Sequence, residues 1–430
     1  MSLAEILIPV LIILIGLSLL KCPIYVSILA AAFYLQIFVV KMPLSSTFTG
    51  VFESMTKNSL MAVPYFMVAG SIIAASSLGK RLINVFIELL RKVRGGFAIA
   101  CVLANGIFGA ISGSGPAATA VFGKICYEPL KERNGENTSL GVIVSSASLS
   151  TVIPPSISMI IYGVATETHI NELFLAGFIP GLMIVVIVSI YLVIISGKKK
   201  ANAGDAPEEK FSGKAFGKAL VEGIPVLILP VIVLGSVYTG ICTPTESGAL
   251  AAAYSFIVAV FILRDIKPKQ LLGVFKDSAR TTGQVFLLIA TSTVFSQAAT
   301  MAQLPQMLQA AFAGMGRVEF LLMLNVLLLI VGCFFDTGAA ILILAPMLLP
   351  TARALGINDL HLGIVFVSNL AIGLFTPPFG LNIFVAQSVL KRPMGVISKS
   401  LVPYIILYIV SVLIITYVPE LSTFLPTVLG

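Results

Sequence analysis

The sequence contains little charge. Only 11% of its 430 residues are Asp, Glu, Lys or Arg, whereas 58% are apolar. A water-soluble fold cannot bury that much apolar surface, so the composition excludes the soluble classes. Uncharged runs such as Ile6 to Leu20 and Leu321 to Phe335 are also longer than a buried core helix needs. The low charge therefore predicts an all-α, polytopic membrane protein.

Groups for redox, metal and nucleotide chemistry are also scarce. The five cysteines form no C-x-x-C pair, which favours small buried hydrophobes over ligands or disulfides. The two histidines, His169 and His361, fall in or beside predicted outer loops, and no His, Glu or Cys cluster has the spacing of metal ligands. Nothing matches G-x-x-x-x-G-K-S/T, and no nucleophile elbow is present. We expect neither ATP hydrolysis nor enzyme activity.

The apolar segments fall into two sets. Residues 197–218 separate the sets and form the only long polar stretch, which predicts a linker between residues 1–196 and 219–430. At about 20 apolar residues per crossing, the segments lie near 3–20, 23–40, 59–78, 96–123, 139–166 and 173–196, and then near 223–240, 244–263, 281–300, 318–351, 361–390 and 401–418.

The two sets also repeat each other. A shift of 221 residues places Pro9 on Pro230 and Pro23 on Pro244. A shift of 223 places Gly115 on Gly338 and the pair Pro154-Pro155 on Pro377-Pro378. Matching Pro and Gly at a nearly constant offset indicates a duplicated, transporter-like architecture.

The basic residues predict how the duplicated halves are oriented. Segments 96–123 and 318–351 are each broken near the middle, and we interpret both as re-entrant hairpins. Each half then crosses the membrane five times, the halves are inverted, and 23 of the 27 Lys and Arg residues lie on one side. By the positive-inside rule the linker is cytoplasmic and both termini are periplasmic. The net charge of +8 thus reports orientation, and we expect no nucleic-acid partner.

Basic and apolar residues are interleaved at helical spacing in 80–94 and 264–280. This pattern predicts amphipathic helices along the cytoplasmic surface of the bilayer. A solvated, positively charged loop is the alternative.

The break in the first hairpin carries GAISGSGPAATA, residues 109–120. A broken helix frees backbone N–H and C=O groups, which hydrocarbon tolerates only beside protein or an aqueous cavity. Freed carbonyls and hydroxyls suit a hard cation such as Na⁺, whereas helix N-termini stabilise anions. We therefore select the hydroxyls of Ser112, Ser114 and Thr119, with Gly113 and Gly115 allowing close approach. The alternative is that the small residues only permit close helix packing.

The Pro-Pro pairs in 139–166 and 361–390 should unwind those helices for a few residues. Thr151, Ser156 and Ser158 in the first, and Thr376 and Asn382 in the second, can then face one cavity. A structural kink is the alternative.

Asp336 is the one acidic residue that this topology places deep in the membrane. An intramembrane carboxylate costs several kcal/mol, so a functional role is favoured over a structural helix cap. Glu246, beside Pro244 at the outer edge, is predicted to cap a helix N-terminus.

The chain resembles the large membrane subunit of tripartite ATP-independent periplasmic (TRAP) transporters. The resemblance runs through LMAVPYFMVAG (60–70), GAISGSGPAATA, IPPSISMIIYGVAT (153–166), FLAGFIPG (174–181), TPTESGALAAAY (243–254), GCFFDTGAAILILAPMLLP and IGLFTPPFGLNIFV (372–385). These motifs are loose singly but specific in this order and spacing.

The resemblance implies a Na⁺-driven importer of a small organic acid, such as a dicarboxylate, a sialic or other sugar acid, or a sulfonate. It implies delivery by a periplasmic binding protein, a small four-helix membrane subunit, which we expect to be a separate protein, and an elevator that slides a transport domain against a scaffold. The location would be a bacterial or archaeal cytoplasmic membrane. The alternative is a stand-alone Na⁺/carboxylate symporter that needs no binding protein.

The family's sites map onto both hairpins and both Pro-Pro breaks of this chain. The carried-over ranges are Ser112–Pro116, Pro154–Ser156, Asp336–Gly338 and Thr376–Gly380. With Ser158 and Asn382, selected above for their place beside the Pro-Pro pairs, the expected substrate residues are Ser114, Ser156, Ser158, Asp336, Thr337 and Asn382. The implied Na⁺ region comprises Ser112, Gly113, Gly115, Pro154, Gly338, Thr376, Pro377 and Gly380.

Overall fold

The computed structural model describes residues 2–20, 22–41, 43, 51, 55–200 and 212–429. These residues form helices joined by short turns and contain no β-strand. Among them, nine helices are long and apolar enough to cross a membrane. The predicted all-α, polytopic membrane architecture is confirmed.

The first half contains α1 (Leu3–Leu19), α2 (Ile24–Tyr34), η1 (Leu35–Val40), η2 (Asn58–Met61), α4 (Ala62–Ala75), α5 (Leu78–Leu89), α6 (Gly96–Ser112), α7 (Gly115–Asn134), α8 (Glu136–Ser146), α9 (Leu149–Val152), α10 (Ile157–Thr166) and α11 (Ile170–Lys200). The second half contains α12 (Gly213–Tyr238), α13 (Pro244–Ile257), η3 (Val258–Ile262), α14 (Pro268–Met301), α15 (Leu304–Ala311), α16 (Arg317–Phe334), α17 (Thr337–Ala354), α18 (Asp359–Gly373), α19 (Leu381–Leu390), α20 (Met394–Tyr417) and α21 (Glu420–Leu429).

The predicted linker is shorter than residues 197–218, because α11 continues to Lys200 and α12 begins at Gly213. Residues 201–211 lie outside the described residues. The two basic segments are helical as predicted: 80–94 contains most of α5, whereas 264–280 contains the first turns of the long helix α14.

The two halves repeat backbone features that the sequence pattern did not reveal. The π-helical segments η1 and η3 follow α2 and α13 at the same offset of 223 residues that relates the Pro-Pro pairs. Lys41 and Arg264, which follow these segments, both have a left-handed backbone with φ of 57°. These correspondences support the predicted duplication.

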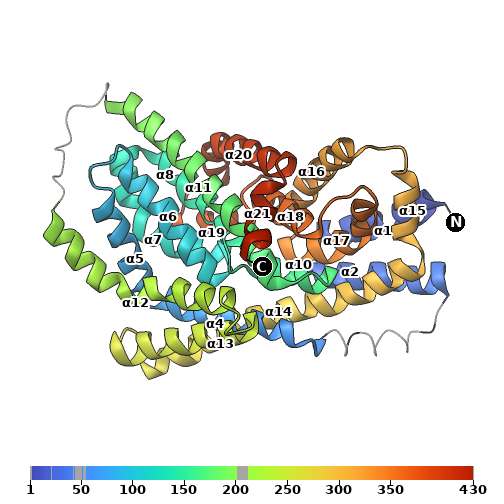
Figure 1. The fold of residues 1–430 in the computed structure, drawn as a ribbon, viewed down its shortest axis with the longest axis horizontal. Helices are drawn as coiled ribbons and strands as arrows, with labels where there is room; N and C mark the ends of the chain where they lie inside the picture. The colour runs from blue at the N-terminus through green and yellow to red at the C-terminus, as the bar shows by residue number, and fades with distance from the viewer. Residues whose placement is uncertain are drawn as a thin grey trace.

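Packing between the halves is reciprocal. First-half α4 packs against second-half α13, and second-half α14 packs against first-half α2. In the same way α7 contacts α19, while α17 contacts α10. Such an exchange of equivalent contacts is the pattern that a two-fold relation produces. In Figure 1, α5–α7 and α15–α17 lie toward opposite ends of the molecule, with α10, α11 and α18 between them. The inverted arrangement and the hairpins themselves stay predictions.

Candidate functional site

The first tip, residues Ser112–Gly115, joins α6 to α7. Gly113 has a left-handed backbone with φ of 60°, which only glycine adopts without cost. Ser114 caps α7, since its hydroxyl accepts a hydrogen bond from the amide of Ala117 at 3.3 Å. The break therefore falls where the sequence predicted it.

The first tip is enclosed by protein. Ser112 is only 3% exposed. A Cβ added to Gly70 on α4 would lie 2.6 Å from the Ser112 Cα, and one added to Gly109 would lie 2.8 Å from the Ser150 Cα. Both glycines are required for close contact between helix backbones, so the first tip lies in a rigid, tightly packed setting.

Asn382 of α19 reaches the first tip from the other half. Its Nδ2 donates to the Val144 carbonyl at 3.2 Å, while its buried Oδ1 has no hydrogen-bond partner within the described residues. A Cβ on Gly115 would lie 3.0 Å from this oxygen and 3.2 Å from the Ala147 carbonyl oxygen. Because a buried, unpaired polar atom is costly, this oxygen is a candidate ligand.

The second tip, residues Phe335–Gly338, joins α16 to α17. Asp336 caps α17, since its Oδ2 accepts from the Gly338 amide at 3.0 Å. The structural role that we set as the alternative thus exists, and the functional role stays a prediction. The Thr337 hydroxyl is buried and, among the described residues, lacks a partner.

The second tip is more open than the first. Asp336 is exposed, and the Phe334 side chain is 52% exposed. The Phe334 ring stacks obliquely on Phe379 of the second break, with 5.7 Å between ring centroids. Phe379 is itself 46% exposed. Asp336 thus lies at the exposed edge of the second tip beside an aromatic surface, whereas Thr337 and Gly338 are buried.

One turn of α10 contacts both tips. A Cβ on Gly113 would lie 2.5 Å from Ile157 Cγ1, and one on Gly338 would lie 3.1 Å from Ile161 Cδ1. Residues four apart lie one above the other on a helix face. The two tips, more than 200 residues apart in sequence, therefore approach the same short stretch of α10.

Eight helix ends lie at the two tips and the two Pro-Pro breaks. Helices α6, α9, α16 and α18 end there, and α7, α10, α17 and α19 begin there. Ser114 and Asp336 cap α7 and α17, whereas Ser156 and Gly380 make no side-chain cap for α10 and α19. Carbonyls at helix C-termini favour cations and free amides at N-termini favour anions, so this region can bind both.

The structure gathers the predicted residues into two connected groups. Residues Ser112–Gly115 form the first tip beside Asn382, and Ile157, which lies between Ser156 and Ser158, packs against Gly113. Residues Asp336–Gly338 lie by the second break, where the Gly380 amide donates to the Thr376 carbonyl at 3.2 Å beside Pro377. Within the described residues no hydrogen bond joins one tip to the other, so the groups are linked through α10 and α19.

Several hydroxyls of the predicted set already have a local acceptor. Ser156 donates to the Thr151 carbonyl at 2.6 Å, Thr151 donates to Ser148, and Thr376 donates to Ile372. Their oxygens remain available as acceptors. Thr119 differs, because its buried hydroxyl has no partner in the described part of the chain.

The sequence reasoning missed residues that act through packing or backbone. Gly70, Ile157, Ile161 and the carbonyls of Val144 and Ala147 all contact the site. A glycine within the apolar α4 segment was the only sequence signal for any of them.

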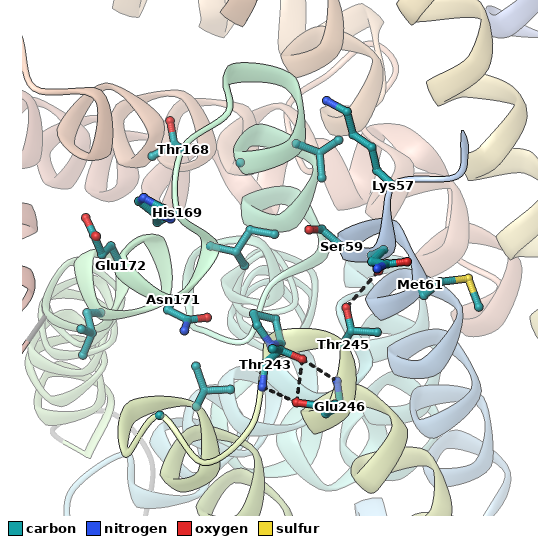
Figure 2. A pocket seen from close by; sticks show the side chains of 18 of the residues that line it. Lys57, Ser59, Met61, Thr168, His169, Asn171, Glu172, Thr243, Thr245 and Glu246 are labelled. Carbon is teal, nitrogen blue, oxygen red and sulfur yellow. Dashed lines mark hydrogen bonds between the residues drawn. The ribbon is translucent and has the colours of Figure 1, made fainter. Parts of the chain in front are cut away.

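A separate cavity of about 930 Å³ lies near the far end of α10. Lys57, Glu167 and Glu246 line it, in segments that the topology places outside. The Lys57 Nζ is 3.8 Å from Glu167 Oε1. Figure 2 shows His169 and Glu172 across the cavity from Lys57. Val164 at its edge is seven residues, or about 10 Å, beyond Ile157, so the cavity is distinct from the first tip.

The Glu246 prediction is confirmed at this cavity. Its carboxylate accepts from the Thr243 amide at 2.8 Å, and its amide donates to the Thr243 hydroxyl at 3.3 Å. This reciprocal pair is a capping box at the Pro-started helix α13. His361, by contrast, is fully buried in α18 between Ser422 and the Thr416 carbonyl.

Residues 11–421 match the family model described as the DctM component of the tripartite ATP-independent periplasmic transporter. The chain belongs to this family. It is thus the large permease component of a TRAP transporter and a multi-pass membrane protein, and the resemblance seen in the motifs is confirmed. Its relatives are transporter permeases rather than enzymes.

The names of curated relatives of this TRAP permease specify different substrates. The C4-dicarboxylate TRAP large permease DctM of Pseudomonas aeruginosa is 37% identical over 384 residues, which cover 88% of this chain and 89% of that protein. The isethionate TRAP permease DctMQ of Oleidesulfovibrio alaskensis is 37% identical over 376 residues, 87% of this chain and 59% of that protein. The ectoine TRAP large permease TeaC of Halomonas elongata is 34% identical over 371 residues, 85% and 86% of the two chains.

A solved transporter supports the fold of the TRAP permease. The crystal structure of the YdaH transporter of Alcanivorax borkumensis superimposes with a TM-score of 0.55, over 87% of this chain and 86% of that one, at 14% identity. At this identity the likeness concerns the fold alone.

Proposed function

We propose that this permease is a secondary importer that couples inward Na⁺ movement to uptake of a small organic acid anion. The observation that carries the proposal is the meeting of eight helix ends beside two buried, unpaired side-chain atoms, Asn382 Oδ1 and Thr337 Oγ1. Unwound carbonyls and half-helix N-termini at mid-membrane are the arrangement by which secondary transporters hold ions and anionic substrates.

The cation would bind where oxygen atoms are concentrated. Around the first tip these are the Ser112 hydroxyl, the Ala147 carbonyl and the Asn382 amide oxygen, with Gly113, Gly115 and Pro154 shaping the backbone. Around the second tip they come from Gly338, Thr376, Pro377 and Gly380. A hard, weakly polarising ion suits such neutral oxygen ligands.

The anion would be held without a basic side chain. The sequence has no Lys or Arg in residues 105–123, 145–166, 325–352 or 368–390, which hold both tips and both breaks. The positive charge must then come from the free N-termini of α10 and α19 and from bound Na⁺. Ser114, Ser156, Ser158, Thr337 and Asn382 would hydrogen-bond the substrate. This dependence of anion binding on Na⁺ is the physical basis of the proposed coupling.

Asp336 would repel a bare carboxylate. We therefore propose that the Asp336 side chain contacts a substrate hydroxyl or a nearby cation. The named relatives act on C4-dicarboxylates, isethionate and ectoine. We assign the class as dicarboxylate, sialic or other sugar acid, or sulfonate, without a choice among its members.

Two partners complete the proposal. A periplasmic binding protein would deliver substrate at the outer cavity, and a separate small four-helix membrane subunit would stabilise the scaffold. The isethionate permease DctMQ extends beyond the region that this chain matches, which accords with a second membrane component.

We place the linker in the cytoplasm and both termini in the periplasm. The hydrogen bond from the Thr245 hydroxyl to the Asn58 carbonyl at 3.1 Å supports placing these two segments on the same side.

We further propose an elevator in which α6–α10 and α16–α19 move against a scaffold that includes α4 and α12–α14. The close approach of Gly70 to Ser112 supports a smooth contact between these bodies.

The orientation can be tested with cysteines placed in residues 198–218. They should react only with membrane-permeant reagents in intact cells, and labelling by an impermeant reagent would overturn the orientation.

The decisive test is substrate uptake into liposomes that contain this permease and its small subunit. With binding protein loaded with one candidate acid outside, we expect uptake only under an inward Na⁺ gradient. Equal uptake with K⁺ replacing Na⁺ would overturn the coupling. If the chain alone catalysed uptake from free substrate, the alternative of a stand-alone symporter would replace the tripartite proposal.

A further inference from the structure

The first turns of α14 present an exposed stripe that mixes basic and apolar side chains. Lys269, Leu272, Lys276 and Arg280 follow one another at spacings of three and four residues, and all are exposed. They therefore lie on one face of the helix. Leu272 is 76% exposed and sits between two lysines.

Aromatic side chains extend this stripe onto the neighbouring segment η3. Phe256 of α13 contacts Phe261 of η3 at 5.8 Å and Phe275 of α14 at 6.3 Å between ring centroids, so it links η3 to α14. Phe261 is 63% exposed, as is Ile262. Arg264 and Lys267 are exposed at the turn between the two helices.

The basic residues of this patch lack acidic partners. None of the five Lys and Arg residues in 264–280 makes an ion pair within the part of the chain that the structure describes. Asp265 is engaged elsewhere, since its Oδ2 accepts from the amide of Ser77 at 2.8 Å and from the Ser77 hydroxyl at 2.6 Å. Asp277 alone stands among the exposed bases. The patch therefore carries a net positive charge.

The opposite face of the same turns is fixed to the protein. Leu271 and Val274 pack against a small core of Ile72, Ala259 and Ile266. The contact from Asp265 to Ser77 also holds the start of α5. An interaction on the exposed face would thus be transmitted to α4, α5 and η3.

We propose that this patch, formed by Phe261, Ile262, Arg264, Lys267 and the stripe of α14, binds anionic phospholipids. Apolar side chains inserted at the acyl boundary with basic side chains at headgroup level are the arrangement that selects anionic lipid. The patch lies on the side that holds most of the basic residues, which is the proposed cytoplasmic leaflet. Bound lipid fixes the cytoplasmic edge of the scaffold in the bilayer surface.

The absence of tryptophan from the sequence gives a direct test. Phe275→Trp provides a single tryptophan within the patch, and Val231→Trp provides one on an exposed apolar site of α12 without nearby bases. Each full-length variant is reconstituted into phosphatidylcholine vesicles that contain brominated phosphatidylglycerol or brominated phosphatidylcholine. Quenching of the tryptophan by each brominated lipid gives the relative affinity of that site.

At position 275 we expect phosphatidylglycerol to be preferred by roughly threefold or more at low salt, and the preference to weaken as salt rises. At position 231 both lipids should quench equally. The triple variant K269Q/K276Q/R280Q should abolish the preference at 275. The matched triple variant K124Q/K214Q/K399Q, which removes the same charge from other exposed sites, should retain it.

Equal quenching by both lipids at position 275 would overturn the proposal, as would a preference that both triple variants leave unchanged. Protection of Phe275→Trp from both brominated lipids by the co-reconstituted small subunit would also overturn it, because the patch would then be a subunit contact. Circular dichroism and size-exclusion chromatography of each variant separate these outcomes from misfolding.

Discussion

The two tips occupy equivalent places in a duplicated chain, yet their surroundings differ. The first tip carries neutral Ser112 and Ser114 and is packed against α4, α9, α10 and α19. The second tip carries the acidic Asp336 and lies beside exposed Phe334 and Phe379. The difference indicates that duplication kept the helix breaks, while the chemistry of each half diverged.

The sharpest test of this comparison substitutes the capping residue at each tip. Asp336→Asn keeps a good capping residue but removes the charge, so uptake should fall at least tenfold, about 1.4 kcal/mol, with expression intact. Ser114→Ala at the equivalent cap should reduce uptake less than Asp336→Asn. Initial uptake rates in proteoliposomes, normalised to protein, measure both. Normal uptake by the Asp336 variant would remove this carboxylate from the site.

The packing around the tips can be probed with Gly70 and Thr293, which are related by the offset of 223. A Cβ on Gly70 would clash with the Ser112 backbone, which cannot move aside as the end of a side chain can. Gly70→Ala should therefore lower the free energy of unfolding by about 1–3 kcal/mol. Thr293 is half-buried, and Thr293→Ala should cost less than about 1 kcal/mol. Thermal unfolding of the purified variants gives both values. A loss below about 1 kcal/mol for Gly70→Ala would contradict the need for glycine where α4 meets Ser112.

Alanine substitution should also destabilise the protein more at the glycine of the first tip than at the glycine of the second tip. Gly113→Ala places a side chain at positive φ and against Ile157, so it should destabilise by about 1–2 kcal/mol. A Cβ on Gly338 would meet only side-chain ends at 3.1 Å or more, so Gly338→Ala should cost less than about 1 kcal/mol. The same unfolding assay applies. A larger loss for Gly338→Ala would reverse the comparison.

The mildest test measures access alone. In a variant without the five native cysteines, Phe334→Cys should react with a small soluble thiol reagent several times faster than Ser112→Cys, because thiol reactivity follows exposure. Mass spectrometry of the labelled protein over time gives the two rates. Equal rates would mean that both tips are equally accessible.

Local chemistry is what the sequence could predict. Gly113, the Pro-Pro pairs and Asp336 each interrupt a helix for a reason that lies in the residue itself, so the sequence predicts where the helices break. It did not predict that Ser114 caps α7, and it gave the cap at Asp336 only as the alternative. The sequence favours a functional role for Asp336 over a helix cap. The cap depends on the contact with the Gly338 amide, and that contact depends on where α17 begins.

Long-range pairing is what the sequence could not predict. Asn382 reaches the Val144 carbonyl across 238 residues. The contacts of Gly70 with Ser112 and of Ile161 with Gly338 likewise join separate segments. A periodic pattern reports which face of a helix is apolar, but it does not identify the helix that covers that face.

The reciprocal packing of the halves has a consequence for biosynthesis. Helices α2 and α4 find their partners, α14 and α13, only in the second half. At a synthesis rate of 5–20 residues per second, a delay of about 220 residues lasts roughly 10 to 45 seconds. During that time the newly inserted first half lies in the bilayer with those faces unmatched. A nascent chain interrupted at the linker would therefore be a substrate for membrane quality control rather than a folded half-transporter.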